Sequence, residues 1–438
     1  MSRLIADFQI AFRSLTQHTR RTLFLGAAVA AVTALLVLLT ALATGARESM
    51  LHTATTLVTG HLNIGGFFKV TAGQSAPAVT NYRAVMDAAK KALPEMAFAV
   101  QRGRGWAKAI SETGSMQVGI GGIDIRNEPE FKQVLRIQSG DINGLEQPGT
   151  ILLFDNQATK LDVKVGDAVT ISAPTTRGAN NTIDLRVVAI AKGIGLLSSW
   201  NVYIPGQSMR ALYQVNTDTT GAIHVHLKPE YADQLNPLAA RLRTALEAAG
   251  FRVMQADARP FWMKFETVNR EDWTGQKLDV TTWEDELSMM TKLLAALQWI
   301  TRLLITVLLA IVVIGIMNTM WIAIRERTRE IGTLRAIGMQ RTGVLWLFLL
   351  ESLLLGLIGT VIGALFGIAV AVGLNALHIP VPISAQIILM SDHLRLVIHP
   401  EQVVRAVVTI TAITGLAALY PALRAARLRP VTAMQHFG

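Results

Sequence analysis

Few residues of this chain have the type and spacing that catalysis, metal binding or phosphate binding requires. His224 and His226 stand two apart in a stretch that predicts a strand, so both side chains lie on one face and could suit a metal ion. No third ligand follows nearby, which favours a solvated strand face. Gly119, Gly121 and Gly122 are followed by no helix with a Lys-Ser/Thr pair, which indicates a turn rather than a phosphate-binding loop. We therefore expect no catalytic residue, no metal site and no cofactor in this chain.

The most specific string of the chain lies in a short basic segment, residues 325–341. Ile331, Leu334 and Ile337 predict an apolar stripe along a short helix whose other faces carry Arg and Glu, and Gly338 is placed to end it. Such a helix could lie at the membrane surface, as generic interfacial helices do. The spacing of the apolar residues alone does not distinguish a helix that lies on the membrane surface from a helix that binds a partner protein.

The distribution of charge indicates which elements position this segment. Residues 1–21, 325–341 and 424–438 together hold 12 of the 41 Lys and Arg but only 3 of the 31 Asp and Glu. Each stretch adjoins a long apolar run, which is the positive-inside pattern of a membrane protein with several spans. The remaining chain is nearly neutral, with 29 basic against 28 acidic residues, so no nucleic acid partner is expected.

Four apolar runs are long enough to cross a bilayer, since about 20 residues suffice. The chain then consists of a cytoplasmic amphipathic segment (1–21), span one (22–46), an outer region (47–302), span two (303–324), a cytoplasmic loop (325–341), span three (342–374), a short outer loop (375–402), span four (403–423) and a cytoplasmic tail (424–438). Both termini are placed in the cytoplasm. A cleaved export signal after Arg20 and Arg21 is the alternative for the first run, but signal sequences have shorter apolar regions.

The outer region has the composition of an ordinary α+β protein. A helix is predicted from Tyr82 to Leu93 and another from Arg241 to Ala249, closed by Gly250. Short alternating runs predict strands near residues 116–120, 168–171, 183–187 and 223–227. The chain has no cysteine, so disulfides do not stabilise this region.

A stalk is predicted where the outer region meets the second span. Thr282 and Asp285 form a capping-box pattern, and apolar residues recur after it at three- and four-residue steps. A single helix from residue 283 to 324 would be roughly 60 Å long, about twice the hydrocarbon thickness. Residues 44–58 predict a second stalk helix, and a flexible tether or a core helix is the alternative. The stalk residues are Leu287, Met290, Leu294 and Leu297.

Two features of the third span are unusual for a membrane helix. Glu351 would cost about 2.5–3.5 kcal/mol at the centre of a span, so it should pair, be protonated or lie near the interface, and a proton relay is the second interpretation. Gly359, Gly363 and Gly367 are four residues apart, which predicts close helix packing within or between subunits.

The string from residue 325 to 339 closely resembles the E-R-x-x-E-I-G-x-L-R-A-x-G signature of the FtsX/MacB-like permeases of ABC transporters. The end of the second span (residues 318–320), the third span and the C-terminal segment Pro421 to Val431 are also similar to that family. Short outer segments, residues 60–64, 122–124 and 282–284, resemble the branch of the lipoprotein-releasing Lol permeases.

This resemblance implies a type VII, or mechanotransmission, permease. Its fold would be an α-helical membrane protein with four transmembrane helices plus a large α+β periplasmic domain, with a porter-like part and a β-rich insertion at about 149–227. It would lie in the bacterial inner membrane, with membrane lipid, a second permease subunit and a cytoplasmic ATPase dimer as partners. The coupling residues would be Arg325, Glu326, Arg327, Glu330, Ile331, Gly332, Leu334, Arg335 and Gly338.

The sequence has no G-x-x-x-x-G-K-S/T motif, so we expect ATP and Mg to be bound by a partner ATPase. The Lol-like branch implies extraction of a lipoprotein or a lipid-like substrate from the outer leaflet of the inner membrane, with a periplasmic lipoprotein carrier as a further partner. Two alternatives within the family are MacB-like export through an outer-membrane duct and FtsX-like activation of a periplasmic hydrolase. A membrane-bound enzyme is the last alternative, and the missing catalytic cluster counts against it.

Overall fold

The structure is a computed structural model that describes residues 13, 19–71, 73–175, 178–193, 197–382, 386 and 393–427. The chain divides into two units. The helical unit comprises Met1–Ala46, Ala295–Pro380 and His393–Gly438, and the α+β unit comprises Arg47–Leu294 and Val381–Asp392. Most of the predicted N-terminal segment, part of the loop 375–402 and the end of the C-terminal motif lie outside the described residues.

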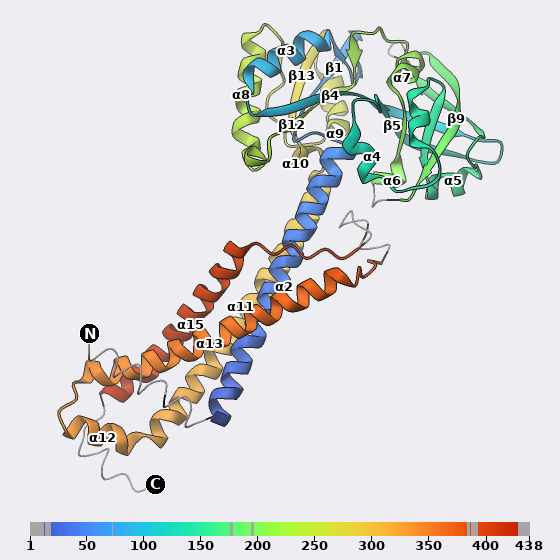
Figure 1. The fold of residues 1–438 in the computed structure, drawn as a ribbon. Helices are drawn as coiled ribbons and strands as arrows, with labels where there is room; N and C mark the ends of the chain where they lie inside the picture. The colour runs from blue at the N-terminus through green and yellow to red at the C-terminus, as the bar shows by residue number, and fades with distance from the viewer. Residues whose placement is uncertain are drawn as a thin grey trace. The chain divides into compact units, whose positions relative to one another are not determined.

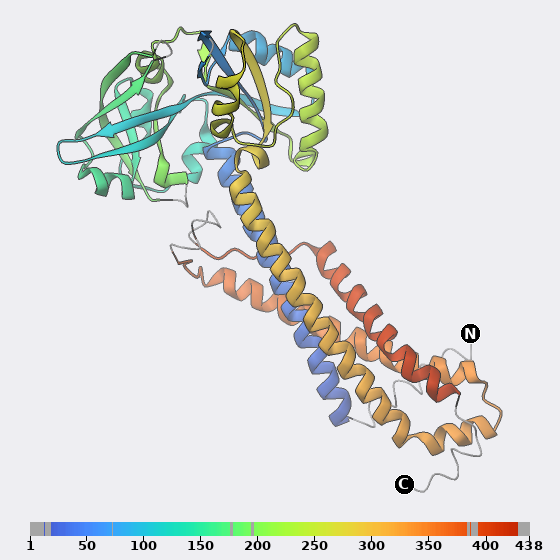
Figure 2. The same ribbon diagram turned by 180° about the vertical axis from the view of Figure 1, so that it is seen from behind.

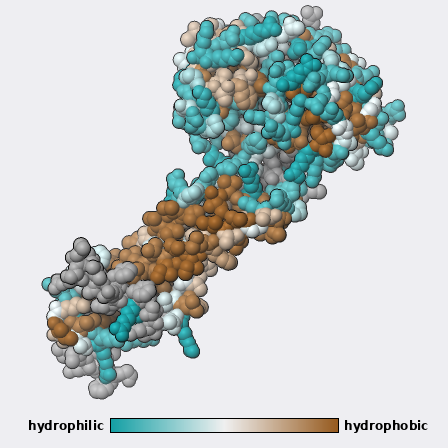
Figure 3. Space-filling model, in the orientation of Figure 1, coloured by the Kyte–Doolittle hydropathy of each residue, from teal (hydrophilic) through white to brown (hydrophobic). Residues whose placement is uncertain are grey.

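Within the described residues, four helices are long and apolar enough to cross a membrane (Figure 1). They are α2 (Thr19–Leu57), α11 (Ser288–Glu326), α13 (Arg341–Ala376) and α15 (Pro400–Ala426). Each predicted span lies inside one of them, and Figure 3 shows brown, hydrophobic side chains along the face of the helical unit that is seen there. A further helix of this unit, α12 (Thr328–Ala336), is short and lies between α11 and α13 in the chain.

One of the two predicted stalk helices is interrupted near its start, and the other is continuous. Helix α2 continues without interruption past the first predicted span to Leu57. In contrast, the predicted helix from residue 283 is divided into α10 (Trp283–Glu286) and α11, because Leu287 between them has φ −110° and ψ 29°. The Thr282 and Asp285 capping box is confirmed, but it caps α10 rather than the long helix.

The α+β unit contains, in its described part, an 11-stranded sheet with the order β13-β1-β12-β4-β5-β10-β7-β9-β6, to which β2 and β8 add at the sides. The bounds are β1 Leu62–Thr71, β2 Gln74–Ala76, β4 Met96–Ile110, β5 Ser115–Ile123, β6 Ile137–Gly140, β7 Thr150–Phe154, β8 Ala168–Pro174, β9 Asn180–Ala191, β10 Asn201–Pro205, β12 Ala222–Leu227 and β13 Gly275–Thr282. Two further short strands, β3 (Val79–Thr80) and β11 (Thr219–Thr220), pair with each other.

Strand β4 joins the two halves of this sheet. Its residues 96–102 pair with β12, and its residues 103–110 pair with β5. The β-rich part therefore begins within β4, and β12 belongs to the other half, so the prediction of a β-rich part at 149–227 is displaced. The reason is that one long strand serves both halves, which sequence patterns cannot indicate.

Helices cover the sheet on both halves. Figure 2 shows α3 (Tyr82–Ala92) and α8 (Leu235–Ala248) side by side on the half that contains β1 and β13. The remaining helical segments are α4 Pro129–Val134, η1 Ile142–Glu146, α5 Asp155–Leu161, α6 Leu197–Trp200, α7 Gly206–Tyr213, η2 Pro229–Tyr231 and α9 Phe261–Arg270. Helix α3 confirms the prediction at 82–93, whereas α8 begins six residues before the predicted start, at Leu235, and is closed by Gly250 with φ +88°.

Candidate functional site

The predicted coupling segment folds as α12, and its ends are well defined by backbone geometry. Arg327, with φ −99° and ψ 11°, separates it from α11. At its other end Gly338 has φ +107°, which favours glycine. The N–H of Gly338 donates to the carbonyl of Arg335 (3.2 Å) and that of Met339 to the carbonyl of Leu334 (3.0 Å), which is a Schellman motif. The predicted stop at Gly338 is confirmed.

An ion pair connects the start of this helix with the third membrane helix. Arg327 Nη1 lies 3.1 Å from Glu351 Oε2, and the two side chains are only 12% and 5% exposed. A carboxylate within a span is costly unless it is paired, and Arg327 supplies the opposite charge. The expectation that Glu351 pairs with another group is confirmed, and the proton relay is not needed to explain it.

A second arginine connects the end of α12 with the fourth membrane helix. Arg335 Nη1 donates to the carbonyl oxygen of Ala426, the last residue of α15, at 2.8 Å. The last carbonyls of a helix lack partners within the helix, and a cation there also interacts favourably with the helix dipole. Arg335 therefore holds α12 and α15 together inside this chain.

The apolar residues of α12 divide between two faces. Ile331 is 3% exposed and packs in a cluster with Ile324, Val344 and Ala422, and Gly332 is also buried. Leu334 and Ile337 are 36% and 80% exposed. The predicted stripe is thus split, since Ile331 contacts the membrane helices and the other two residues face outward.

The outward surface of α12 and of the residues just before it is charged. Arg325, Glu326, Arg329 and Glu330 are exposed there, close in sequence to the exposed Leu334 and Ile337. This surface therefore combines charges of both signs with two exposed apolar side chains. We call these six residues the α12 outer face.

The glycines of the third span pack within the chain. A Cβ atom added to Gly359 would lie 3.1 Å from Val29, and one added to Gly367 would lie 3.0 Å from the carbonyl oxygen of Ala34. At Gly363 the added atom would overlap the backbone of Ala30. All three contacts are made with α2, so this glycine face forms the α2–α13 contact and is not open to a second subunit.

Comparison with known proteins adds the family. Residues 302–430 match the family model described as FtsX-like permease C-terminal. The uncharacterized ABC transporter permease YvrN of Bacillus subtilis is 33% identical over 122 residues, which is 28% of this chain and 26% of that protein. The macrolide export ATP-binding/permease protein MacB of Agrobacterium fabrum is 33% identical over 121 residues, which is 28% of this chain and 17% of that protein.

Over these residues the chain resembles the FtsX/MacB-like permeases of ABC transporters. It spans about a quarter or less of the length of these two relatives. Two solved structures have limited likeness: the extracellular domain of the transporter YknZ from Gram-positive bacteria (TM-score 0.30, 13% identity, 49% of this chain and 98% of that one) and the periplasmic region of MacB from Actinobacillus actinomycetemcomitans (0.28, 13%, 42% and 85%). At these scores the likeness carries no argument.

Further residues of this chain hold the stalk end of α2 in the α+β unit, and sequence reasoning did not find them. Arg102, on β4, is 4% exposed, and its guanidinium donates to the carbonyls of Thr56 (2.6 Å) and Leu57 (2.5 Å) at the end of α2. It also forms an ion pair with the buried Glu128. The hydroxyl of Tyr203 donates to the carbonyl of Leu57 at 2.9 Å. The end of α2 is thereby attached to the strand that joins the two halves of the sheet.

The start of the other stalk helix contacts the same strand. Glu286, the last residue of α10, lies 3.8 Å from Arg104 on β4 and accepts hydrogen bonds from the hydroxyl of Thr281 (2.7 Å) and the N–H of Phe261 (3.3 Å). Burial raises the pKa of the Glu286 carboxyl, and Arg104 opposes that shift. Arg102 and Arg104 are two residues apart on β4, so a single strand contacts both stalk elements.

The expected solvated strand face at His224 and His226 is wrong, because the two side chains are only 4% and 6% exposed. Burial lowers the pKa of both imidazoles, that of His226 to about 3. The ring of Phe98 stacks on His226 at 4.3 Å, and the ring of His61 lies 5.9 Å away. Among the described residues no three potential ligands come together as a metal site.

The four predicted stalk residues differ in how deeply they are buried. Met290 and Leu294 are buried on α11, and Leu287 is buried at the interruption before it. Leu297 is 44% exposed, in the part of α11 that belongs to the helical unit. The predicted seam therefore describes a buried contact only in its first half.

Proposed function

We propose that this permease is a subunit of an ABC transporter in which ATP hydrolysis by a separate ATPase dimer drives motion of the α+β unit. The observation that carries this proposal is the attachment of α12. Its inner face is fixed to α13 by the Arg327–Glu351 ion pair and to α15 by the Arg335 hydrogen bond, while its outer face is exposed. A force applied to the outer face would therefore move the membrane helices rather than bend a loose loop.

In this proposal α12 and both termini lie in the cytoplasm of a bacterium, the spans lie in the inner membrane, and the α+β unit lies in the periplasm. ATP and Mg are bound by the ATPase. A second permease subunit, either another copy or a related chain, completes the transporter. The positive-inside distribution of Arg residues supports this orientation.

For the substrate we propose a lipoprotein or a lipid-like molecule taken from the outer leaflet of the inner membrane and passed to a periplasmic lipoprotein carrier. Two of the three outer segments that resemble the Lol branch lie together, since Leu62 on β1 pairs with Thr282 on β13 and the N–H of Trp283 donates to the carbonyl of His61 (3.1 Å). MacB-like export is the second candidate, because MacB proteins named for macrolide export recur among the relatives.

The coupling proposal is tested by a charge reversal on the outer face. Glu330→Arg leaves the permease intact because Glu330 is exposed, and it should reduce ATPase binding in a pull-down by about tenfold or more, since it replaces attraction by repulsion at an interface. Glu112→Arg, in an exposed turn of the α+β unit, is the matched control. Equal ATPase recovery with both variants would refute the coupling role of the outer face.

Arg335 is a poor choice for the same test, although the sequence suggested it. Its guanidinium holds the end of α15, so Arg335→Ala would alter the permease itself.

The identity of the substrate needs a separate experiment. Permease and ATPase reconstituted in proteoliposomes with a radiolabelled lipoprotein should release it to a carrier in an ATP-dependent way, whereas a macrolide exporter should instead raise macrolide resistance of the host without releasing lipoprotein.

A further inference from the structure

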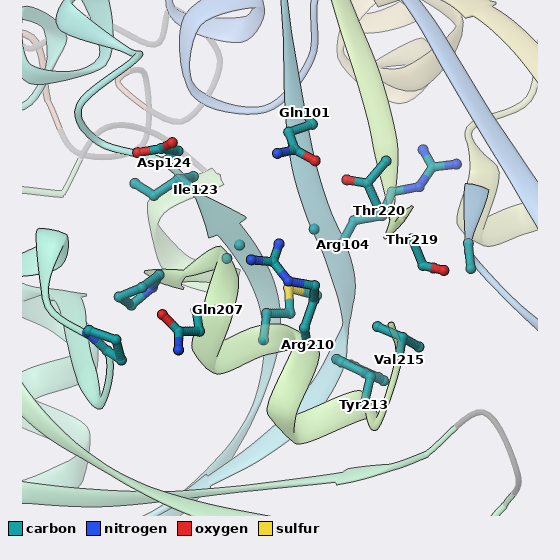
Figure 4. A pocket seen from close by; sticks show the side chains of 18 of the residues that line it. Gln101, Arg104, Ile123, Asp124, Gln207, Arg210, Tyr213, Val215, Thr219 and Thr220 are labelled. Atoms are coloured by element: carbon teal, nitrogen blue, oxygen red, sulfur yellow. The ribbon is translucent and has the colours of Figure 1, made fainter. Parts of the chain in front are cut away.

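The α+β unit contains a cavity of about 250 Å³ beside β4, at the point where the two halves of the sheet meet. Figure 4 shows side chains that line it, and most of the labelled ones come from β4, β5, β11 and α7. Met209 of α7 lies on one wall, against Gly103 and Gly122, which pair with each other in the sheet. A side chain at either glycine would collide with Met209, so this wall depends on the two glycines.

One cation in this cavity has no opposing charge. The guanidinium of Arg210, on α7, makes no hydrogen bond or ion pair with any other described residue, and the side chain is partly buried. Its Nη1 lies 3.5 Å from the point where a Cβ atom would stand if Gly206, the first residue of the same helix, had a side chain. The guanidinium is therefore folded back beside the N-terminus of α7, and in Figure 4 it points into the cavity.

The N-terminus of α7 adds positive potential at the same place. The first N–H groups of a helix have no partner within the helix, and this end of the dipole is positive. Here the N-cap residue is Pro205, which provides no side-chain acceptor. A guanidinium beside an uncapped helix N-terminus is electrostatically unfavourable unless an anion lies between them.

The other charged residues of the cavity are engaged elsewhere. Arg126 forms an ion pair with Glu146 at 3.0 Å, and Asp124, at the cavity edge in Figure 4, accepts hydrogen bonds from the N–H of Arg126 and the side chain of Asn127 within its own loop. Arg104 is directed to Glu286 and to the ring of Phe261. The side-chain oxygen of Gln101 is buried in the cavity wall without a hydrogen-bond partner.

We propose that this cavity is a binding site for a small ligand that carries an oxyanion, a phosphate or a carboxylate, held by Arg210 and the N-terminal N–H groups of α7. The volume is below that of pockets for drug-sized molecules, which fits a compact group such as a glycerol phosphate. The site is independent of the proposed transport substrate.

Binding is tested with the full-length permease purified in detergent, in a buffer free of phosphate and carboxylates. Isothermal titration with inorganic phosphate, glycerol 3-phosphate and acetate should give saturable binding of at least one probe, at one site per chain. Arg210→Gln should weaken that binding about tenfold or more. Arg210→Lys, which keeps the charge but not the planar donor pair, should restore part of it.

Arg126→Gln is the matched control, because Arg126 lines the same cavity but is exposed and paired with Glu146. It should leave the affinity within about threefold of the original. The proposal is overturned if no probe binds, if Arg210→Gln binds as well as the original, or if both Gln variants lose affinity equally, which would indicate a general effect of net charge. An unchanged melting temperature of ligand-free Arg210→Gln shows that the variant is folded.

Discussion

Arg327 and Glu351 form an ion pair in a region with little access to water, and removing either partner leaves the other charge buried. Breaking a buried pair costs about 3–5 kcal/mol, far more than an exposed pair contributes. At the scale of single residues, this pair should therefore be the most sensitive contact of α12. It also explains why a carboxylate can be accommodated within the third span.

Glu351→Gln tests this directly. The substitution keeps the size of the side chain but leaves the Arg327 guanidinium without a counter-charge, and we expect the stability of the helical unit to fall by about 3 kcal/mol. The measurement is the thermal unfolding of the purified permease in detergent. Glu401→Gln is the control, because Glu401 and Arg405 form an exposed pair on α15. Equal melting temperatures of the two variants would contradict the importance of the buried pair.

The buried histidines predict a pH dependence of the α+β unit. Burial lowers the pKa of His61, His224 and His226, so the unfolded chain binds protons before the folded one does. Stability is then complete above pH 6.5 and is lost as the pH falls from 6.5 toward the folded pKa, which is about 3 for His226. Each histidine contributes a slope of up to about 1.4 kcal/mol per pH unit.

His226→Gln should reduce this slope, measured as the change in thermal unfolding between pH 7.5 and pH 5. His52→Gln, on an exposed part of α2, should leave it unchanged. If the stability of the two variants depended on pH to the same extent, burial of His226 would not be a cause of the pH dependence.

At the scale of elements, the contact between α2 and α13 depends on the absence of side chains. Gly363→Ala places a methyl group on the backbone of Ala30, so the helices must separate, and we expect a loss of about 1–3 kcal/mol. Gly373→Ala on the same helix meets nothing within 4 Å and should be neutral or stabilising by up to about 1 kcal/mol. Thermal unfolding in detergent compares the two, and a loss in Gly373→Ala as large as in Gly363→Ala would contradict the packing assignment.

Those elements that are governed by local pattern could be predicted from the sequence. The four membrane helices followed from the long apolar runs, and the end of α12 followed from Gly338, because both depend on composition or on one backbone conformation. The interruption at Leu287 and the sharing of β4 between two halves of the sheet arise from tertiary contacts. Nothing near these residues in the sequence indicates them.

The candidate site could likewise be predicted from the sequence only in part. The string at α12 located the coupling segment, but it did not show that Arg327 and Arg335 contact α13 and α15 within the chain. Arg102 carried no signal in the sequence, since an arginine in a strand is usually exposed. Its role depends on carbonyl groups 45 and 46 residues away, at the end of α2.

At the scale of the whole molecule, α2 and α11 each include residues of both units among those that the structure describes. Helix α11 follows Glu286, which contacts Arg104, and α2 ends at the carbonyls held by Arg102. An uninterrupted helix transmits an axial displacement better than a kinked one, and α11 is uninterrupted from Ser288 to Glu326, with Leu287 separating it from Glu286. The proposed function therefore requires that α11 remain continuous near Ala295, where the two units meet in sequence.

Ala295→Pro tests this requirement. Proline removes the N–H that bonds four residues back and its ring displaces that carbonyl, so α11 kinks at an exposed position without creating a cavity. In the complex with ATPase, trapping the nucleotide-bound state should still change hydrogen exchange at α12, because the outer face is intact. The change expected in β4 of the original protein should be lost. Ala295→Ser, which preserves the helix, should retain both changes, and a β4 response that survives in Ala295→Pro would mean that the displacement reaches the sheet by α2 alone.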